Sequence, residues 1–88
     1  MTDSYKVLIA AAAERELRSL PKADRARITK RILALSGNPR PAGCNKLTGL
    51  EGYRLRVGRY RVLYVVADET RTATIYAIGH RREVYRKR

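Results

Sequence analysis

The sequence predicts an α+β fold with the order β-α-α-β-β-β, in which a helical hairpin covers one face of an antiparallel-rich sheet. Three observations favour this fold. The chain has 88 residues, enough for one domain with one small core. Apolar residues recur at helical spacing between positions 11 and 36, and β-rich segments follow between 53 and 78. The apolar share of 44% is ordinary for a folded protein, so we expect a single domain over residues 1–88.

The N-terminal segment predicts a strand followed by a helix. Tyr5–Ala10 alternates weakly and contains Val7, Leu8 and Ile9, which is typical of a strand. In the next segment, Ala11–Leu20, the apolar residues Ala13, Leu17 and Leu20 recur at i, i+4 and i+7. This spacing places them on one face of a helix, and that face is expected to pack on the sheet.

A proline separates this helix from a second one. The residue before a proline avoids the α region, whereas Pro21 itself suits the first turn of a new helix. The second helix is predicted over Lys22–Ser36, and Gly37 is a suitable residue to end it. Its inward-facing side chains are expected to be Ile28, Ile32 and Leu35.

Three strands are predicted in the C-terminal half. Tyr53–Val57 alternates apolar with basic residues, Tyr60–Ala67 is an almost unbroken β-rich run, and Thr72–Ile78 is the last strand. Gly58-Arg59 suits a two-residue hairpin turn because glycine supplies positive φ at the first position. The unbroken run predicts a central strand buried on both faces. A short strand start is expected at Asn45–Leu47, and the sheet face away from the helices is expected to be largely bare.

The charge balance points to a polyanionic ligand. Twenty Lys and Arg against eight Asp and Glu give a formal net charge of +12. Arginine greatly outnumbers lysine, and its planar guanidinium binds phosphate through two hydrogen bonds and stacks on bases. Nucleic acid or an acidic protein is therefore the expected partner. An ordinary solvated basic surface is the alternative explanation of the same composition.

The cysteine count and the hydropathy of the chain indicate the cellular compartment in which the protein is expected. The single Cys44 excludes an internal disulfide and a cysteine zinc cage, and it fits a reducing cytosol, so a cytoplasmic protein without a bound cofactor or metal is expected. The longest apolar run, Val7–Ala13, is too short to cross a membrane. No membrane partner is expected.

Basic residues on the predicted strands suggest a phosphate-binding surface. Arg54 and Arg56 share one face of their strand, and the hairpin turn returns Arg61 beside them. Whether Arg61 faces the same side depends on the strand register, which the sequence leaves open. The cations Lys46, Arg81 and Arg82, and the phenol of Tyr85, are expected near the same sheet.

These residue types suit RNA cleavage without a metal. Such a reaction needs a base for the 2′-hydroxyl, cations for the charge on the phosphate, and a proton for the leaving 5′-oxygen. His80 is the only histidine, and we expect a structural rather than a catalytic role for it. Neighbouring arginines favour the phenolate form of tyrosine, so Tyr85 beside Arg81 could act as the base. Packing or capping is the alternative role for Tyr85.

Three segments resemble the toxins of RelE-type bacterial toxin–antitoxin pairs. They are residues 45–50 (Asn-Lys-Leu-Thr-Gly-Leu), 53–64 (Tyr-Arg-Leu-Arg-Val-Gly-Arg-Tyr-Arg-Val-Leu-Tyr) and 78–85 (Ile-Gly-His-Arg-Arg-Glu-Val-Tyr). The resemblance implies a toxin that enters the ribosomal A site, cleaves translated mRNA there and so inhibits translation. The catalytic set that it implies corresponds here to Arg61, Arg81 and Tyr85. Arg54 and Arg56, where some relatives have lysine, would join Arg82 and Lys46 in binding phosphate.

The resemblance also implies partners, and alternatives remain. The expected partners are a cognate acidic and partly disordered antitoxin, the ribosomal A site and mRNA. The related ParE-type toxins have the same fold but poison DNA gyrase without nuclease activity. A module that binds RNA or the ribosome without cutting is a third reading. Together, Arg61, Arg81 and Tyr85 favour the ribonuclease.

Overall fold

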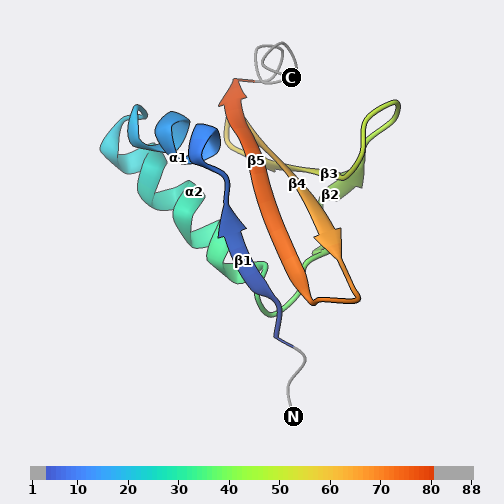
Figure 1. The fold of residues 1–88 in the computed structure, drawn as a ribbon. Coiled ribbons are helices and arrows are strands. Elements are labelled where there is room, and N and C mark those ends of the chain that lie inside the picture. Colours follow the sequence, from blue (N-terminus) through green and yellow to red (C-terminus); the bar gives the residue numbers. More distant parts are fainter. Residues whose placement is uncertain (1–3, 81–88) are drawn as a thin grey trace.

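The computed structural model describes residues 4–80. Its elements follow the order β1 (Lys6–Ile9), α1 (Ala11–Arg18), α2 (Lys22–Ala34), β2 (Cys44–Lys46), β3 (Tyr53–Val57), β4 (Tyr60–Ala67) and β5 (Thr72–His80). The strands form one sheet in the spatial order β1-β5-β4-β3-β2. β1 pairs in parallel with β5, and the other three pairings are antiparallel. Both helices lie on the same side of the sheet (Figure 1).

The structure confirms the predicted α+β architecture. The bounds of β3 and β4 agree with the sequence prediction, and β4 is the central strand. The expected strand start near Asn45 is a full edge strand, β2, so the sheet has five strands. β5 extends two residues beyond its predicted end, and His80 therefore lies in the strand. Neither helix of residues 4–80 is long and apolar enough to span a membrane.

The main core lies between the helices and the sheet. Ala13 and Leu17 of α1 are buried, as are the three inward residues predicted for the second helix. Their partners from the sheet are side chains of β3, β4 and β5 that point toward the helices: Leu55, Val57, Tyr60, Val62, Tyr64, Ile75 and Ile78. Burial of these apolar surfaces is the main source of stability in so small a domain.

A side chain of α1 covers one edge of β5. β1 leaves β5 after the Ile9–Ile75 pair, where the Ala10 N–H donates to the Ile75 carbonyl over 2.8 Å. Further along β5, the Ile78 N–H donates to Oε1 of Glu16 over 2.8 Å. A carboxylate of α1 therefore replaces the missing strand, which satisfies a partly buried backbone group.

The face away from the helices is not bare, contrary to the expectation from the sequence. Leu63 and Ala77 point to this face and are 0% and 3% exposed, and Leu47 and Tyr76 pack against them. Leu47 belongs to the loop between β2 and β3, which folds over this side of the sheet. Periodicity could not reveal this cover because the loop has no regular pattern.

Polar contacts tie four distant segments together at the end of the sheet opposite the β3–β4 turn. The guanidinium of Arg40 donates to both carboxylate oxygens of Asp68, over 3.2 and 2.9 Å, and to the Tyr53 hydroxyl over 2.9 Å. The Tyr5 hydroxyl donates to Asp68 over 2.6 Å. The hydrogen bond from Arg40, with that from Tyr5, holds the pKa of Asp68 below its usual value. We call these residues the Arg40–Asp68 clamp.

We predict that Asp68→Asn lowers the melting temperature at neutral pH, because an amide cannot replace the charged acceptor of the clamp. A carboxylate whose pKa is lowered by folding stabilises the protein above its unfolded pKa, about 3.9. This contribution is lost as pH falls through the lower folded pKa. Melting curves of both proteins between pH 7 and pH 2.5 should converge at the acid end. A difference that does not depend on pH would contradict the role of the charge.

Candidate nucleic-acid interface

Three arginines gather on the sheet face that points away from the helices. In the β3–β4 register, Arg56 lies directly opposite Arg61, and Arg54 lies opposite Leu63. Directly opposed residues of an antiparallel pair point to the same face, and so do residues two apart in one strand. Arg54, Arg56 and Arg61 therefore share one face. The register settles the question that the sequence left open for Arg61.

The hairpin turn fixes this register. Gly58 has φ of +62°, which supports the two-residue connection predicted from the sequence. The pairing of Val57 with Tyr60 directs these two apolar side chains to the core. A shift by one residue would bring the arginines under the helices, where burial of unpaired charge is costly.

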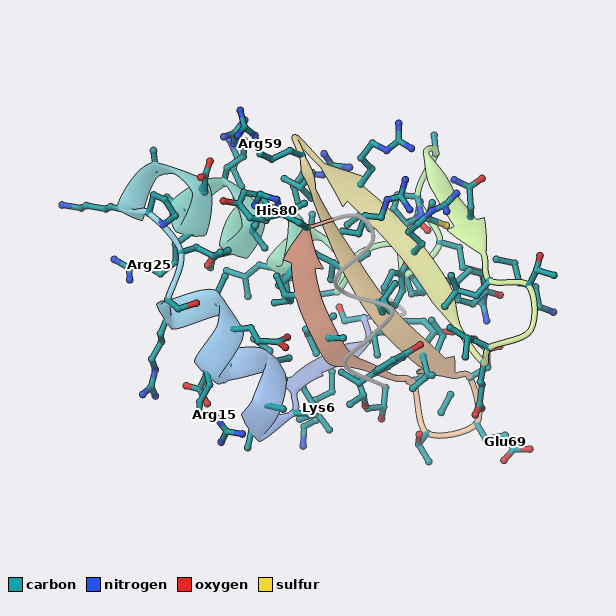
Figure 2. The ribbon with its side chains drawn as sticks, turned by 90° about the horizontal axis from the view of Figure 1, so that it is seen from above. Lys6, Arg15, Arg25, Arg59, Glu69 and His80 are labelled. Atoms are coloured by element: carbon teal, nitrogen blue, oxygen red, sulfur yellow. The ribbon has the colours of Figure 1, made fainter. Side chains whose placement is uncertain are left out.

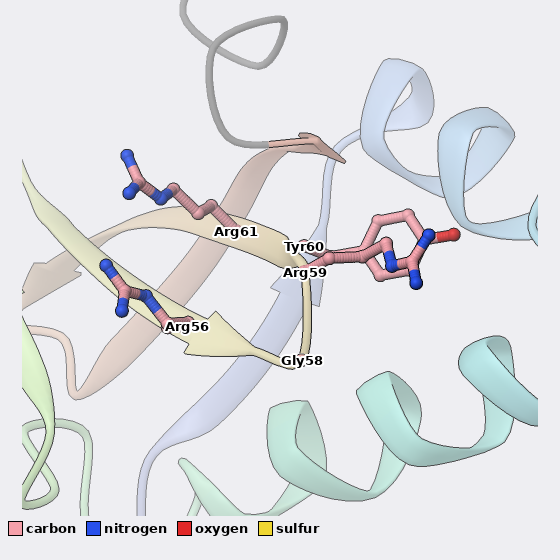
Figure 3. Close-up of a pocket in the computed structure, with 5 residues that line it drawn as sticks. All are labelled: Arg56, Gly58, Arg59, Tyr60 and Arg61. Carbon is pink, nitrogen blue, oxygen red and sulfur yellow. The ribbon is translucent and has the colours of Figure 1, made fainter.

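A small hollow of about 120 Å³ lies at the tip of the hairpin, lined by Arg56, Gly58, Arg59, Tyr60 and Arg61. Figure 3 shows Arg56 and Arg61 pointing to the same side of the sheet, away from α2. The side chains of Arg59 and Tyr60 extend to the opposite side, toward the helices. Cations are therefore present on both sides of the hairpin tip.

The β3–β4 hairpin carries four arginines, Arg54, Arg56, Arg59 and Arg61. Arg56 and Arg59 are exposed, and within residues 4–80 neither guanidinium group makes a hydrogen bond or ion pair. Like charges directly opposite each other in a sheet are destabilising, and an anion bound between Arg56 and Arg61 would reduce their repulsion. Residues 4–80 contain no group of three or more side chains that could hold a metal ion.

Lys46 borders a second hollow beside these arginines. This hollow measures about 330 Å³ and also contacts Arg54 and Arg61. Lys46 pairs with Tyr53, however, and the Tyr53 side chain packs against the core on the helix-covered side. The structure thus brings Lys46 to the rim of the site without placing it on the same face as Arg54.

Two tyrosines of β4, Tyr60 and Tyr64, are poorly suited to act as bases. Tyr60 is 6% exposed, and its burial, followed by its 3.1 Å hydrogen bond to Asp24, raises the pKa of its phenol. Burial likewise raises the pKa of Tyr64, whose hydroxyl donates to the Pro39 carbonyl over 2.8 Å. Both phenols thus favour the protonated form and serve the core, as their positions in strands predicted.

His80 packs against a core tyrosine. Its ring lies edge-on to Tyr60, with 4.7 Å between the ring centroids. Figure 2 shows His80 and Arg59 at the same end of the molecule. The contact supports the expected structural role, because it holds the end of β5 against β4.

The predicted residues Arg81, Arg82 and Tyr85 lie outside the described residues. The strand that leads to them is described up to His80, which pairs with Tyr60, while Gly79 pairs with Arg61. The described part of β5 therefore ends one residue after the position that pairs with Arg61.

The sequence analysis missed the loop residues Leu47, Thr48 and Leu50, which line the larger hollow. Residues 48–50 were used only as part of the segment that resembles RelE toxins. The two glycines of this loop, Gly49 and Gly52, could have indicated that it is sharply bent. They have φ of +80° and +108° and give the loop its bends. Arg59 was missed as well, since it was assigned only to the hairpin turn.

Comparisons with known proteins show that the chain is similar to bacterial toxins. Residues 7–85 match the family described as the ParE toxin of the type II toxin-antitoxin system parDE. The chain is 33% identical over 85 residues to Toxin RelG of Mycobacterium tuberculosis, which covers 94% of this chain and 98% of the relative.

Solved structures of RelE proteins have the same fold. The toxin–antitoxin complex RelBE2 of M. tuberculosis matches with a TM-score of 0.80 and 29% identity, over 91% of this chain and 93% of the other. The RelE–RelB complex of Pyrococcus horikoshii matches with a TM-score of 0.79 and 32% identity, over 90% and 97%. Isolated Escherichia coli RelE gives 0.76 and 28%, over 96% and 94%. The chain therefore belongs to the RelE/ParE superfamily and is a RelE-like toxin of a type II toxin–antitoxin system.

Proposed function

We propose that this toxin is a ribosome-dependent mRNA endoribonuclease that inhibits translation. The observation that carries the proposal is the cross-strand pair of Arg56 and Arg61, with Arg54 on the same exposed face. Such a cluster suits the phosphates of a single RNA strand, since each guanidinium can donate two hydrogen bonds to phosphate oxygens. An ordinary solvated basic face would gain nothing from two like charges at positions that the register places opposite each other.

The reaction proceeds by attack of the RNA itself and needs no metal. The 2′-oxygen loses its proton and attacks the adjacent phosphorus, and the bond from phosphorus to the 5′-oxygen breaks. The leaving oxygen takes up a proton. The products are a 2′,3′-cyclic phosphate on one fragment and a 5′-hydroxyl on the other.

Each residue has an assigned role in this reaction. Arg61 stabilises the charge that develops on the phosphate, and Arg54 and Arg56 position the backbone. Tyr85 is the candidate base, and Arg81 either favours its phenolate or assists the leaving oxygen. Tyr85 follows His80 by five residues, which span at most about 18 Å of extended chain, so it can reach the phosphate held by Arg61. Arginine stays protonated in proteins, and Arg54 and Arg56 therefore bind rather than transfer protons.

Further cations extend the binding surface. Lys46 borders the larger hollow, and Arg82 adjoins Arg81 in the sequence. Both would hold phosphates that flank the one being cut. Their contribution is electrostatic and should fall as salt concentration rises.

Gyrase inhibition is a second candidate because the matching family is described as the ParE toxin. A gyrase inhibitor binds its target without nuclease chemistry, so it would not depend on the hydroxyl of Tyr85. The opposed arginines and the RelE relatives favour the ribonuclease.

The function is tested on ribosomes programmed with a defined mRNA. We expect the wild-type toxin to cut within the codon in the A site, with the ends mapped by primer extension. Naked mRNA should be cut far more slowly, because positioning by the ribosome is worth roughly 7–11 kcal/mol of the barrier. Equal rates on free and ribosome-bound mRNA would contradict ribosome dependence. Inhibition of purified gyrase without any RNA cleavage would favour the second candidate.

Tyr85→Phe tests the base directly, since it removes only the ionisable hydroxyl. Ribosome binding should persist while single-turnover cleavage falls by about 10²–10⁴, the usual effect of losing a general base. Tyr5→Phe, which removes a hydroxyl at the end of the sheet opposite the β3–β4 turn, is a matched control. Wild-type cleavage by Tyr85→Phe would show that another group takes the proton.

A neutralising antitoxin is the expected partner of such a basic toxin. RelE is seen with RelB in the complexes of the relatives. We propose that an acidic and partly disordered antitoxin covers the arginine face here and raises the melting temperature through binding to the folded state. Co-purification from an operon that carries both genes tests this. Harmless expression of the toxin alone would argue against the proposed antitoxin.

We also predict that Arg56→Gln makes the free toxin more stable and less active. Removing one of two opposed cations should stabilise the fold by about 0.2–1 kcal/mol, most clearly at low salt. RNA binding should weaken with a reduced salt slope. Lys30→Gln on α2 removes the same charge far from the pair and serves as control. If both variants melt alike, repulsion between Arg56 and Arg61 does not limit stability.

A further inference from the structure

The loop between β2 and β3 forms a hollow next to the arginine face. The hollow measures about 330 Å³ and is lined by Lys46, Leu47, Thr48, Leu50, Arg54 and Arg61. This volume is at the lower end of the range for small-molecule sites, about 300–1,000 Å³. Two of the arginines assigned to RNA phosphates therefore also form one side of a partly apolar cavity. The loop projects from the side of the sheet away from the helices (Figure 1).

Several contacts hold this loop in place. The Leu47 N–H donates to the Gly52 carbonyl over 2.9 Å and closes the loop at its base. The Tyr76 hydroxyl donates to the Glu51 carbonyl over 3.1 Å. Leu47 packs on Leu63 and Ala77. The hollow is thus supported by strands β4 and β5 and does not need to form when a ligand arrives.

The close fit of Gly52 adds to this support. Its φ is +108°, and a Cβ at this position would collide with the backbone carbonyl oxygen of Tyr64. Only glycine lets the end of the loop lie this close to β4.

The walls of the hollow have the chemistry of a base site. Leu47 and Leu50 are half-buried and offer apolar surface to the flat face of a ring. Thr48 is exposed, and its hydroxyl makes no hydrogen bond to any other residue between positions 4 and 80. A hydroxyl can donate to or accept from the edge of a base. Arg54 and Arg61 stand where the phosphate joined to that base would lie.

We propose that this hollow receives one nucleobase of the bound RNA, next to the phosphate held by Arg54 and Arg61, and so sets the sequence preference of cleavage. The inference rests on the proposed ribonuclease function and adds its specificity site. Bases displaced from a strand are commonly held between apolar side chains and read at their edges by hydrogen bonds. Leu50 would hold the ring, and Thr48 would contact its edge.

The test compares codon preferences. Ribosomes carrying mRNAs with every codon in the A site are treated with wild-type toxin, Leu50→Trp or Thr48→Val, and the cut ends are sequenced. Leu50→Trp fills the hollow and should change the ratio of preferred to disfavoured bases at one codon position by tenfold or more. Thr48→Val keeps the shape but removes the hydroxyl, and should change it by about 3–10-fold, the effect of one neutral hydrogen bond. Leu33→Trp, on the exposed face of α2, is the matched control and should leave the ratio unchanged.

The outcomes separate this proposal from the proposed function. If the wild-type toxin cuts no ribosome-bound mRNA, the proposed function is wrong and the base site fails with it. If the wild-type toxin cuts but both loop variants keep its codon preference, only the base site is wrong. Equal loss of cutting on all codons would assign the loop to general binding and would also overturn the proposal. Unchanged preference with weaker antitoxin binding would assign the hollow to a protein partner instead. Melting curves should confirm that each variant is folded.

Discussion

The register between β3 and β4 is the constraint on which the rest of the structure depends. It places Leu55 opposite Val62 and Val57 opposite Tyr60, so these side chains form the core under the helices. The same register necessarily places Arg56 opposite Arg61 on the other face. Burial of these apolar side chains therefore holds the two arginines opposite each other despite their repulsion. The free energy gained by burying the hydrophobic core offsets the unfavourable repulsion on the charged face.

The sequence predicted those parts of this arrangement that the alternation of apolar and polar residues can reveal. Tyr53–Val57 alternates apolar and basic residues, so its two faces could be assigned from the sequence alone. Tyr60–Ala67 is apolar on both faces, and its alternation could not show where Arg61 points. Only the pairing with β3 settles that point. Both helices begin where the sequence predicted and end two residues earlier, at Arg18 and Ala34, so Leu20 lies outside α1. The buried residues of the helical region were predicted well because i, i+3 and i+4 spacing is a strong signal.

The features that sequence reasoning missed are contacts between distant segments. The Arg40–Asp68 clamp joins residues 28 positions apart, and neither residue stands in a pattern that indicates a partner. The contact between Glu16 and the Ile78 N–H spans 62 positions. The hollow beside Arg54 requires a loop to fold back over the sheet, and loop paths depend on single backbone positions such as Gly52. Three expected site residues, Arg81, Arg82 and Tyr85, lie outside the described residues.

The distribution of charge links the stability of this toxin to its partners. Carboxylates pair with arginines away from the β3–β4 face, as in the contacts of Glu14 with Arg18 and of Asp68 with Arg40. Arg56 and Arg59, by contrast, have no ion pair within residues 4–80. A polyanion that covers this face removes the repulsion and stabilises the folded state by mass action. RNA phosphates and antitoxin carboxylates, the two ligands proposed for this face, would offer the same relief, and both could not occupy one face at once. Competition for the opposed arginines would then be enough for an acidic antitoxin to silence the toxin, without any change in the fold.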